Sequence, residues 1–204
     1  MFDKILKVAN LYDEGLTLVQ SRRDQWLHRY EGVREHLKLL AQYLNENAKY
    51  KQGFFVDTLH AFNEDIRGTS SKMPSLTFRS GAMPVLVTFR NSMGERKTYS
   101  EEGFSISFTP TIAGQILVLL RPHYSDIDQE EPEYSTIAII EEPEALTNDV
   151  VTEIVTRGME AAFFSSFTGM TRLNDENGEQ ALENKPIPRN PIGFKRYDTT
   201  EKVQ

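Results

Sequence analysis

The sequence contains no cysteine among its 204 residues. This absence excludes disulfide bonds, cysteine nucleophiles and thiolate metal sites. Long apolar runs are also absent: the longest, Ile116 to Leu120, is far shorter than the roughly 20 residues of a membrane-spanning helix. Asp3 and Lys4 interrupt the N-terminal segment, which lacks the apolar core of a secretory signal. The sequence therefore predicts a cytoplasmic protein that does not cross a membrane.

Sequence motifs of catalysis and cofactor binding are missing as well. There is no G-x-S-x-G, no glycine-rich phosphate loop and no dinucleotide fingerprint. The four histidines have no metal-ligand spacing. The acidic stretch 126–133 lacks the glycine and the final glutamate of a calcium loop, and the stretch 174–179 does not fit the register of such a loop. We therefore predict no cofactor, no metal and no catalytic residue, and favour a protein that is not an enzyme.

Positive charge is scarce in the last part of the chain. The net charge is −7, and it divides into +3 over residues 1–121 and −10 over residues 122–204. Nucleic-acid binding needs a basic face for the phosphates, so a nucleic-acid partner is disfavoured. The imbalance fits either a solvated acidic surface or a contact between the basic region of one copy and the acidic region of another.

The clearest positive signal is a helical stripe between Val19 and Leu44. Its steps of four and three residues place one side chain per half-heptad on a single helix face, which predicts a long helix over residues 3–50. The stripe continues more weakly toward Ile5, and Gly15 is the predicted point of a bend or break. The stripe residues are Trp26, Tyr30, Val33, Leu37, Leu40 and Leu44.

So narrow a stripe needs another surface to cover it. The sequence leaves two surfaces open, the chain's own sheet and a second copy of the chain. Arg22, Arg29 and His36 are seven residues apart and flank the stripe, where they either point to water or hold an acidic partner.

Residues 54–66 are ambiguous. Phe55, Leu59, Phe62 and Ile66 step by four, three and four residues, which favours a second helix and hence a helical hairpin. The alternating set Phe55, Asp57, Leu59 and Ala61 mixes polar and apolar side chains on one face, which argues against a strand. A connecting loop is predicted from Arg67 to Pro74.

From Ser75 onward the apolar period changes to two, which is typical of strands. Strands are predicted at residues 76–79, 84–90, 96–100, 104–109, 115–121 and 134–141. The connections are too short for parallel crossovers, so an antiparallel meander follows. The strand at 115–121 is apolar on both faces and is predicted to be central and covered on both sides.

A buried helix that runs to about Phe167 is predicted, with either Thr147 or Asn148 as its cap. The fold class is therefore α+β: a long N-terminal helix, an antiparallel sheet of five or six strands, a buried C-terminal helix and an irregular tail. The predicted regions are 1–67 (helical), 75–169 (sheet and last helix, in one domain with the first region) and 170–204 (tail).

The leading functional hypothesis is a non-enzymatic assembly or adaptor protein, which forms a homo-oligomer or binds a protein partner. The interface would be the stripe together with Arg22 and Arg29. The alternative is a binding protein for an apolar small molecule in a cavity between sheet and last helix. That cavity would be lined by Phe104, Ile106, Phe108, Met159 and Phe163. A third hypothesis, a hydrolase or transferase, requires His123 to meet a carboxylate such as Asp126 or Asp128.

Overall fold

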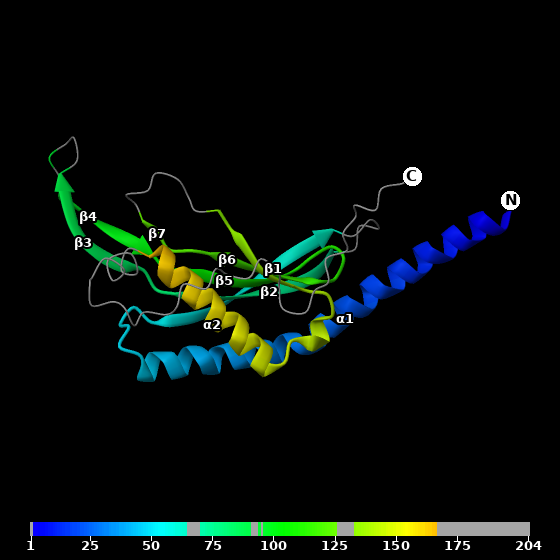
Figure 1. Cartoon of the computed structure of the whole chain (residues 1–204), viewed down its shortest axis with the longest axis horizontal. Helices are drawn as coiled ribbons and strands as arrows, with labels where there is room; N and C mark the ends of the chain where they lie inside the picture. Colours follow the sequence, from blue (N-terminus) through cyan, green and yellow to red (C-terminus); the bar gives the residue numbers. More distant parts are fainter. Residues whose placement is uncertain (1, 65–69, 91–93, 95, 126–132, 167–204) are drawn as a thin grey trace, which may run out of the picture.

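The computed structural model describes residues 2–64, 70–90, 94, 96–125 and 133–166 (Figure 1). It is an α+β fold with a long N-terminal helix, an antiparallel sheet and a C-terminal helix, as the sequence predicts. The predicted tail at 170–204 lies outside the described residues.

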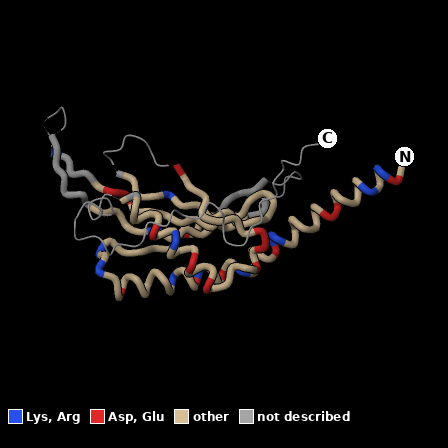
Figure 2. The backbone as a smooth tube through the Cα atoms, viewed as in Figure 1, with Lys and Arg blue, Asp and Glu red and all other residues tan. Residues whose placement is uncertain are grey.

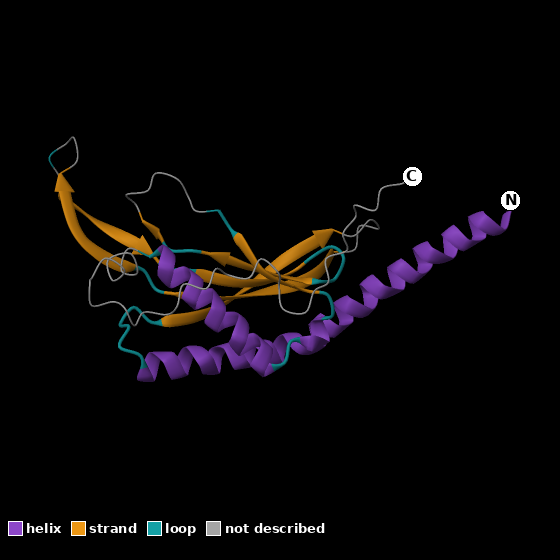
Figure 3. Ribbon diagram, in the orientation of Figure 1, coloured by secondary structure: helices purple, strands orange, loops and turns teal. Residues whose placement is uncertain are grey.

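Helix α1 (Phe2–Asn47) is continuous over 46 residues, so the predicted break at Gly15 does not occur. Its second half lies along the sheet, and its first half extends beyond the rest of the molecule (Figure 3). The buried residues of α1 recur every three or four positions and form one face of the helix. They are Trp26, Tyr30, Val33, Leu37 and Ala41.

The main sheet has five strands in the order β1-β2-β5-β6-β8, and every neighbouring pair is antiparallel. Alternate residues point to opposite faces, so strand register decides which side chains share the core face. Phe78 pairs with Ile106, and Ile106 pairs with Leu120; all three are buried. The strands are β1 (Phe54–Glu64), β2 (Ser70–Ser80), β5 (Ser105–Pro110), β6 (Ile116–Arg121) and β8 (Ser135–Ile140).

A second sheet of three strands interrupts the predicted meander. Strand β2 pairs with β5, because the chain between them forms β3 (Met83–Arg90) and β4 (Arg96–Glu102). Strand β7 (Tyr124–Ser125) joins β4 at the other edge. Strand β7 follows β6 closely, and residues 126–132 lie outside the described ranges.

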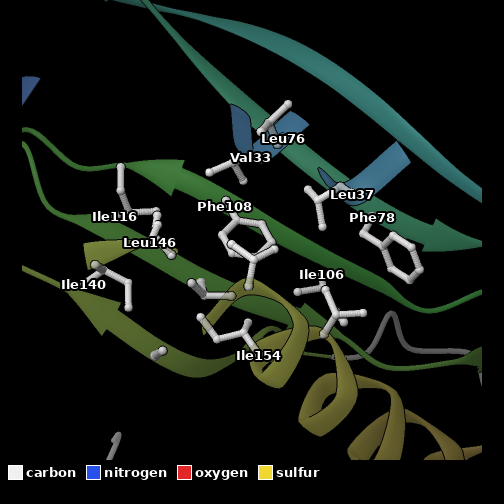
Figure 4. Packing of buried hydrophobic residues seen from close by; sticks show 14 of the residues in the cluster. Val33, Leu37, Leu76, Phe78, Ile106, Phe108, Ile116, Ile140, Leu146 and Ile154 are labelled. Carbon is white, nitrogen blue, oxygen red and sulfur yellow. The ribbon is translucent and has the colours of Figure 1, made fainter. Parts of the chain in front are cut away.

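Both helices pack against the main sheet, α1 on β1 and β2 and α2 on β6 and β8. Phe108 lies at the centre of this core, with Leu37 from α1 on one side and Ile154 from α2 on the other (Figure 4). Strand β6 is central, as predicted, but Leu117 and Leu119 on its other face are only half-buried.

Helix α2 (Asn148–Ser165) begins where the sequence predicts, after the short helix η1 (Pro143–Ala145). Thr147 is the N-cap, and its hydroxyl accepts a hydrogen bond from the Val150 amide. The described helix ends at Ser165, and the predicted end at Phe167 lies outside the described residues.

The predicted helix over residues 54–66 is wrong, because residues 54–64 form strand β1 and pair with β2 along their full length. The alternate residues that face the core are not Phe55, Asp57 and Leu59 but the set between them. The face that turns toward α1 carries Phe54, Val56 and Thr58, whereas Phe55 and Leu59 are exposed. Residues 70–74 of the predicted loop are likewise part of strand β2.

Candidate interaction surface

The predicted interface stripe is covered by the chain's own sheet. Trp26, Val33 and Leu37 are buried in the core. The Trp26 indole Nε1 donates a hydrogen bond to the Pro74 carbonyl oxygen at 2.8 Å. Tyr30 donates from its hydroxyl to Thr58 Oγ1 at 3.2 Å. These side chains are therefore not an exposed interface in this fold.

The remaining stripe residues are also used within the chain. Leu40 and Leu44 are partly buried and pack against the same core. Ala41, which was not among the predicted stripe residues, is buried in their place. The stripe thus shifts by one position near its end, because an α-helix has 3.6 residues per turn rather than the 3.5 of a strict heptad.

The basic residues beside the stripe hold the connection between β8 and α2. Arg22 forms an ion pair with Glu141 at 3.6 Å between nitrogen and oxygen. Arg29 Nη2 donates to the Leu146 carbonyl oxygen at 2.6 Å, and His36 Nε2 lies 2.8 Å from Thr152 Oγ1. These contacts are internal, so Arg22 and Arg29 fasten α1 to its own chain and do not form an exposed anion grip.

The uncovered apolar surface lies in the first part of α1, residues 2–18, which we call the arm. Half of the large apolar side chains that are exposed in the described part of the chain belong to it. Phe2 is 85% exposed and Leu16 is 68% exposed. The full set is Phe2, Ile5, Leu6, Val8, Leu11, Tyr12, Leu16 and Leu18.

The first part of the body to contact α1 after the arm is the turn between β5 and β6. A Cβ placed on Gly114 of that turn would lie 2.8 Å from Arg22 Cβ and 3.0 Å from the Val19 carbonyl oxygen. Arg23 Nη2 donates to the Ile112 carbonyl oxygen in the same turn at 3.3 Å. Val19 therefore marks the border between the arm and the covered half.

The charges of the arm are nearly balanced (Figure 2). Lys4 and Lys7 stand in its first half, with Asp3 beside them, and Asp13 and Glu14 stand in its second half. The charged side chains lie mostly away from the apolar face, so the arm is an amphipathic helix without a strong electrostatic preference.

The residues of the predicted ligand cavity pack against protein at several points. A Cβ on Gly158 of α2 would lie 2.4 Å from Ile106 Cδ1, so helix and sheet are in direct contact there. Phe104 packs against Phe54 and Phe78, with ring centroids 6.4 Å apart in each pair. Phe108 is fully buried, Met159 is partly buried against the core, and Phe163 packs edge-on against Phe164.

His123 lies within electrostatic range of a carboxylate, although not one of the two that the sequence predicts. Asp126 and Asp128 lie outside the described residues, and the acidic neighbour is Glu101 of β4, which is only 2% exposed. Burial lowers the pKa of His123, while the Glu101 charge and a backbone hydrogen bond at Glu102 act in the opposite direction. The Phe104 ring lies edge-on to the imidazole at 5.5 Å.

Tyr50 belongs to the same polar cluster. Its hydroxyl donates to the Gly81 carbonyl oxygen at 3.0 Å. Burial raises the pKa of Tyr50, and the negative charge of Glu101 acts in the same direction. Tyr50, Ser80, Glu101 and His123 come from four separate segments, where the three-stranded sheet joins the main sheet. The cluster therefore has a structural position at the root of β3 and β4.

The described ranges offer neither a metal site nor a membrane span. No three histidine, aspartate or glutamate side chains in them gather as a possible metal site. Neither helix within these ranges combines the length and apolar character required to cross a bilayer. Comparison with known proteins matches the chain to no family model, no curated protein and no solved structure.

Proposed function

We propose that this protein is a non-enzymatic assembly protein that self-associates through the arm. The observation that carries the proposal is the uninterrupted helix whose first 17 residues, Phe2 to Leu18, leave their apolar face uncovered. Contiguous exposed apolar patches of this kind mark interaction sites on folded proteins. The proposed interaction surface is thus the arm, which directly precedes the predicted interface stripe on the same helix.

The energetics favour association of modest strength. Full burial of a large apolar side chain contributes about 1.5–3 kcal/mol, and the stripe face of each arm offers the exposed side chains of Phe2, Ile5, Tyr12 and Leu16. Association costs roughly 4–15 kcal/mol in lost freedom and ordering. The arm therefore supplies enough apolar surface for a reversible oligomer.

A second copy suits the arm better than a lipid surface. Helices that lie on anionic membranes carry several lysines or arginines on the polar face. The arm has two lysines against three acidic residues, so a negatively charged bilayer would not attract it. Its nearly balanced charges raise no comparable barrier to an apolar helix partner.

The test is the mass of the full chain in solution, measured by sedimentation equilibrium across a range of concentrations. The wild type is expected to associate into multiples of 23.4 kDa. A Tyr12→Glu, Leu16→Glu double variant places two charges on the apolar face. It should stay monomeric up to a concentration at least tenfold higher than the one at which the wild type associates. Because Tyr12 and Leu16 are exposed, its thermal unfolding temperature should match that of the wild type at low concentration.

An Asn10→Glu, Thr17→Glu double variant is the matched control. It adds the same charge to the same part of the helix, on the opposite, polar face, and is expected to associate like the wild type. A wild-type chain that stays monomeric at several hundred micromolar contradicts the proposal. Equal weakening by the two double variants would also contradict it, since the effect would then be one of net charge.

A further inference from the structure

We propose that the arms of two copies pair antiparallel, with Ala9 of each copy opposite Tyr12 of the other. This inference rests on the proposed self-association through the arm and specifies the partner surface. The observations that support it are the step pattern of the arm, the position of the folded body on the helix, and the distribution of small, large and charged residues along the arm.

The arm continues the heptad stripe of the covered half. Phe2, Ile5, Ala9, Tyr12, Leu16 and Val19 are separated by steps of three, four, three, four and three. Such steps bring one narrow face of a helix against a second helix. The steps are the same in both directions, so two antiparallel copies can align every one of these positions.

The folded body excludes a parallel pair on this face. From Trp26 onward the same helix face is covered by the sheet, and the turn at Gly114 reaches α1 at Val19. A parallel partner helix lying on the arm would run directly into that turn and the sheet behind it. The N-terminal end of α1 extends away from the sheet (Figure 1), so in an antiparallel pair the two bodies would lie at opposite ends of the paired arms.

The border at Val19 also selects the register. The longest overlap that stops at this border places Phe2 opposite Val19, Ile5 opposite Leu16, and Ala9 opposite Tyr12. The smallest side chain of the stripe then faces the largest one on the arm's central layers, which packs two helices closely. Ile112, which is exposed in the adjoining turn, adds apolar surface where Phe2 of the partner copy would arrive.

Shifts by one heptad are less favourable. A longer overlap would place Ile5 opposite Arg23, which already contacts Ile112. It would also bring Glu14 of one copy next to Glu14 of the other. A shorter overlap leaves Leu16 and Val19 uncovered. Like charges in contact and uncovered apolar surface both disfavour these registers.

Charge favours the same orientation. In the antiparallel pair, Lys7 of one copy lies at the level of Glu14 of the other. A parallel pair in register would instead place each lysine of one copy next to the same lysine of the other copy. Opposed helix dipoles act in the same sense. These contributions are small for exposed groups, but all of them point to one arrangement.

The absence of cysteine makes disulfide trapping a direct test. Ala9→Cys and Tyr12→Cys single variants of the full chain are prepared separately, then mixed and equilibrated in a glutathione redox buffer. A disulfide needs Cα atoms about 4.4–6.8 Å apart. The mixture is expected to give a cross-linked pair of twice 23.4 kDa, and each variant alone should give at most a tenth of that yield.

Lys7→Cys mixed with Glu14→Cys is the matched control. These two positions lie at the same level in the proposed register but on the outer face of each helix, so they should not cross-link. Sedimentation of each variant under reducing conditions gives its association state independently of the disulfide.

The outcomes separate the orientation from the self-association. Efficient cross-linking of Ala9→Cys to itself would overturn the antiparallel arrangement while leaving self-association in place. Association without a cross-link in the Ala9→Cys, Tyr12→Cys mixture would also overturn the inference, because the arm would then meet another surface of the second copy. Monomeric behaviour of all variants and of the wild type would overturn the inference and the proposed function together.

Discussion

The two halves of α1 share one sequence pattern but have different surroundings. From Trp26 to Ala41 the stripe is buried beneath strands of the same chain, and Leu37 is fully inaccessible to solvent. In the arm the same face is open, and Leu16 is 68% exposed. The helix is continuous through both halves. An apolar stripe therefore shows that a helix face must be covered. The extent of the sheet determines which part of that face the chain covers by itself.

The largest difference in stability should appear when one leucine is replaced by alanine in each half of α1. Leu37→Ala is expected to lower the free energy of unfolding by about 2–5 kcal/mol, because it leaves a cavity in a packed core. Leu16→Ala should change it by no more than about 0.5 kcal/mol. Urea unfolding at low protein concentration measures both. Equal losses would mean that the arm is covered within the monomer.

The aromatic residues provide a second matched pair. Trp26→Phe removes the buried Nε1 donor to Pro74 and should cost about 1–3 kcal/mol, since the carbonyl loses its partner. Tyr12→Phe removes an exposed hydroxyl and should leave the free energy of unfolding unchanged. Thermal and urea unfolding of both variants would test this, and an unchanged Trp26→Phe protein would contradict the assigned hydrogen bond.

Acidification should weaken the body without affecting the arm. Because the pKa of His123 is lowered in the folded state, the unfolded state binds the extra proton as the pH falls below about 6.5. Stability should therefore decrease from pH 7 to pH 5, and a His123→Gln variant should show a flatter profile. The arm contains no histidine, so its self-association should hold over this range. A wild-type profile as flat as the variant's would contradict the prediction.

The smallest expected effect distinguishes the two helical glycines. A Cβ added at Gly15 or at Gly32 would meet no atom within 4 Å outside the surrounding helix backbone, so alanine fits at both. Gly32→Ala should stabilise the fold by about 0.5–1 kcal/mol through its helix propensity. Gly15→Ala should raise far-ultraviolet helicity while leaving the unfolding midpoint within error. A gain of equal size at both positions would show that the arm unfolds together with the core.

Much of the fold could be predicted because its signals are local. The period of the α1 stripe, the Thr147 cap and the alternation in β5 each depend on neighbouring residues. Strand β1 was missed because its inward residues, Phe54, Val56 and Thr58, include a polar side chain that is matched by Tyr30. That match depends on a residue from another element, which periodicity alone does not include.

The candidate surface was only partly predictable for a related reason. The sequence shows that α1 carries one long apolar face, including its weaker extension toward Ile5. It does not show that the covered part of α1 begins at Val19, since this border depends on where the turn at Gly114 contacts the helix. The partner of His123 was missed because Glu101 belongs to a strand of the second sheet, whose connection to the first was not predicted.

The hydrogen bond from Trp26 to Pro74 and that from Arg29 to Leu146 join residues 48 and 117 positions apart. Synthesis proceeds from the N-terminus at about 5–20 residues per second, so the whole of α1 leaves the ribosome seconds before the strands that will cover it. During that interval the covered half presents the same apolar face as the arm. Under the proposed self-association, nascent chains on one messenger RNA would therefore expose a longer apolar helix face to one another than finished molecules do.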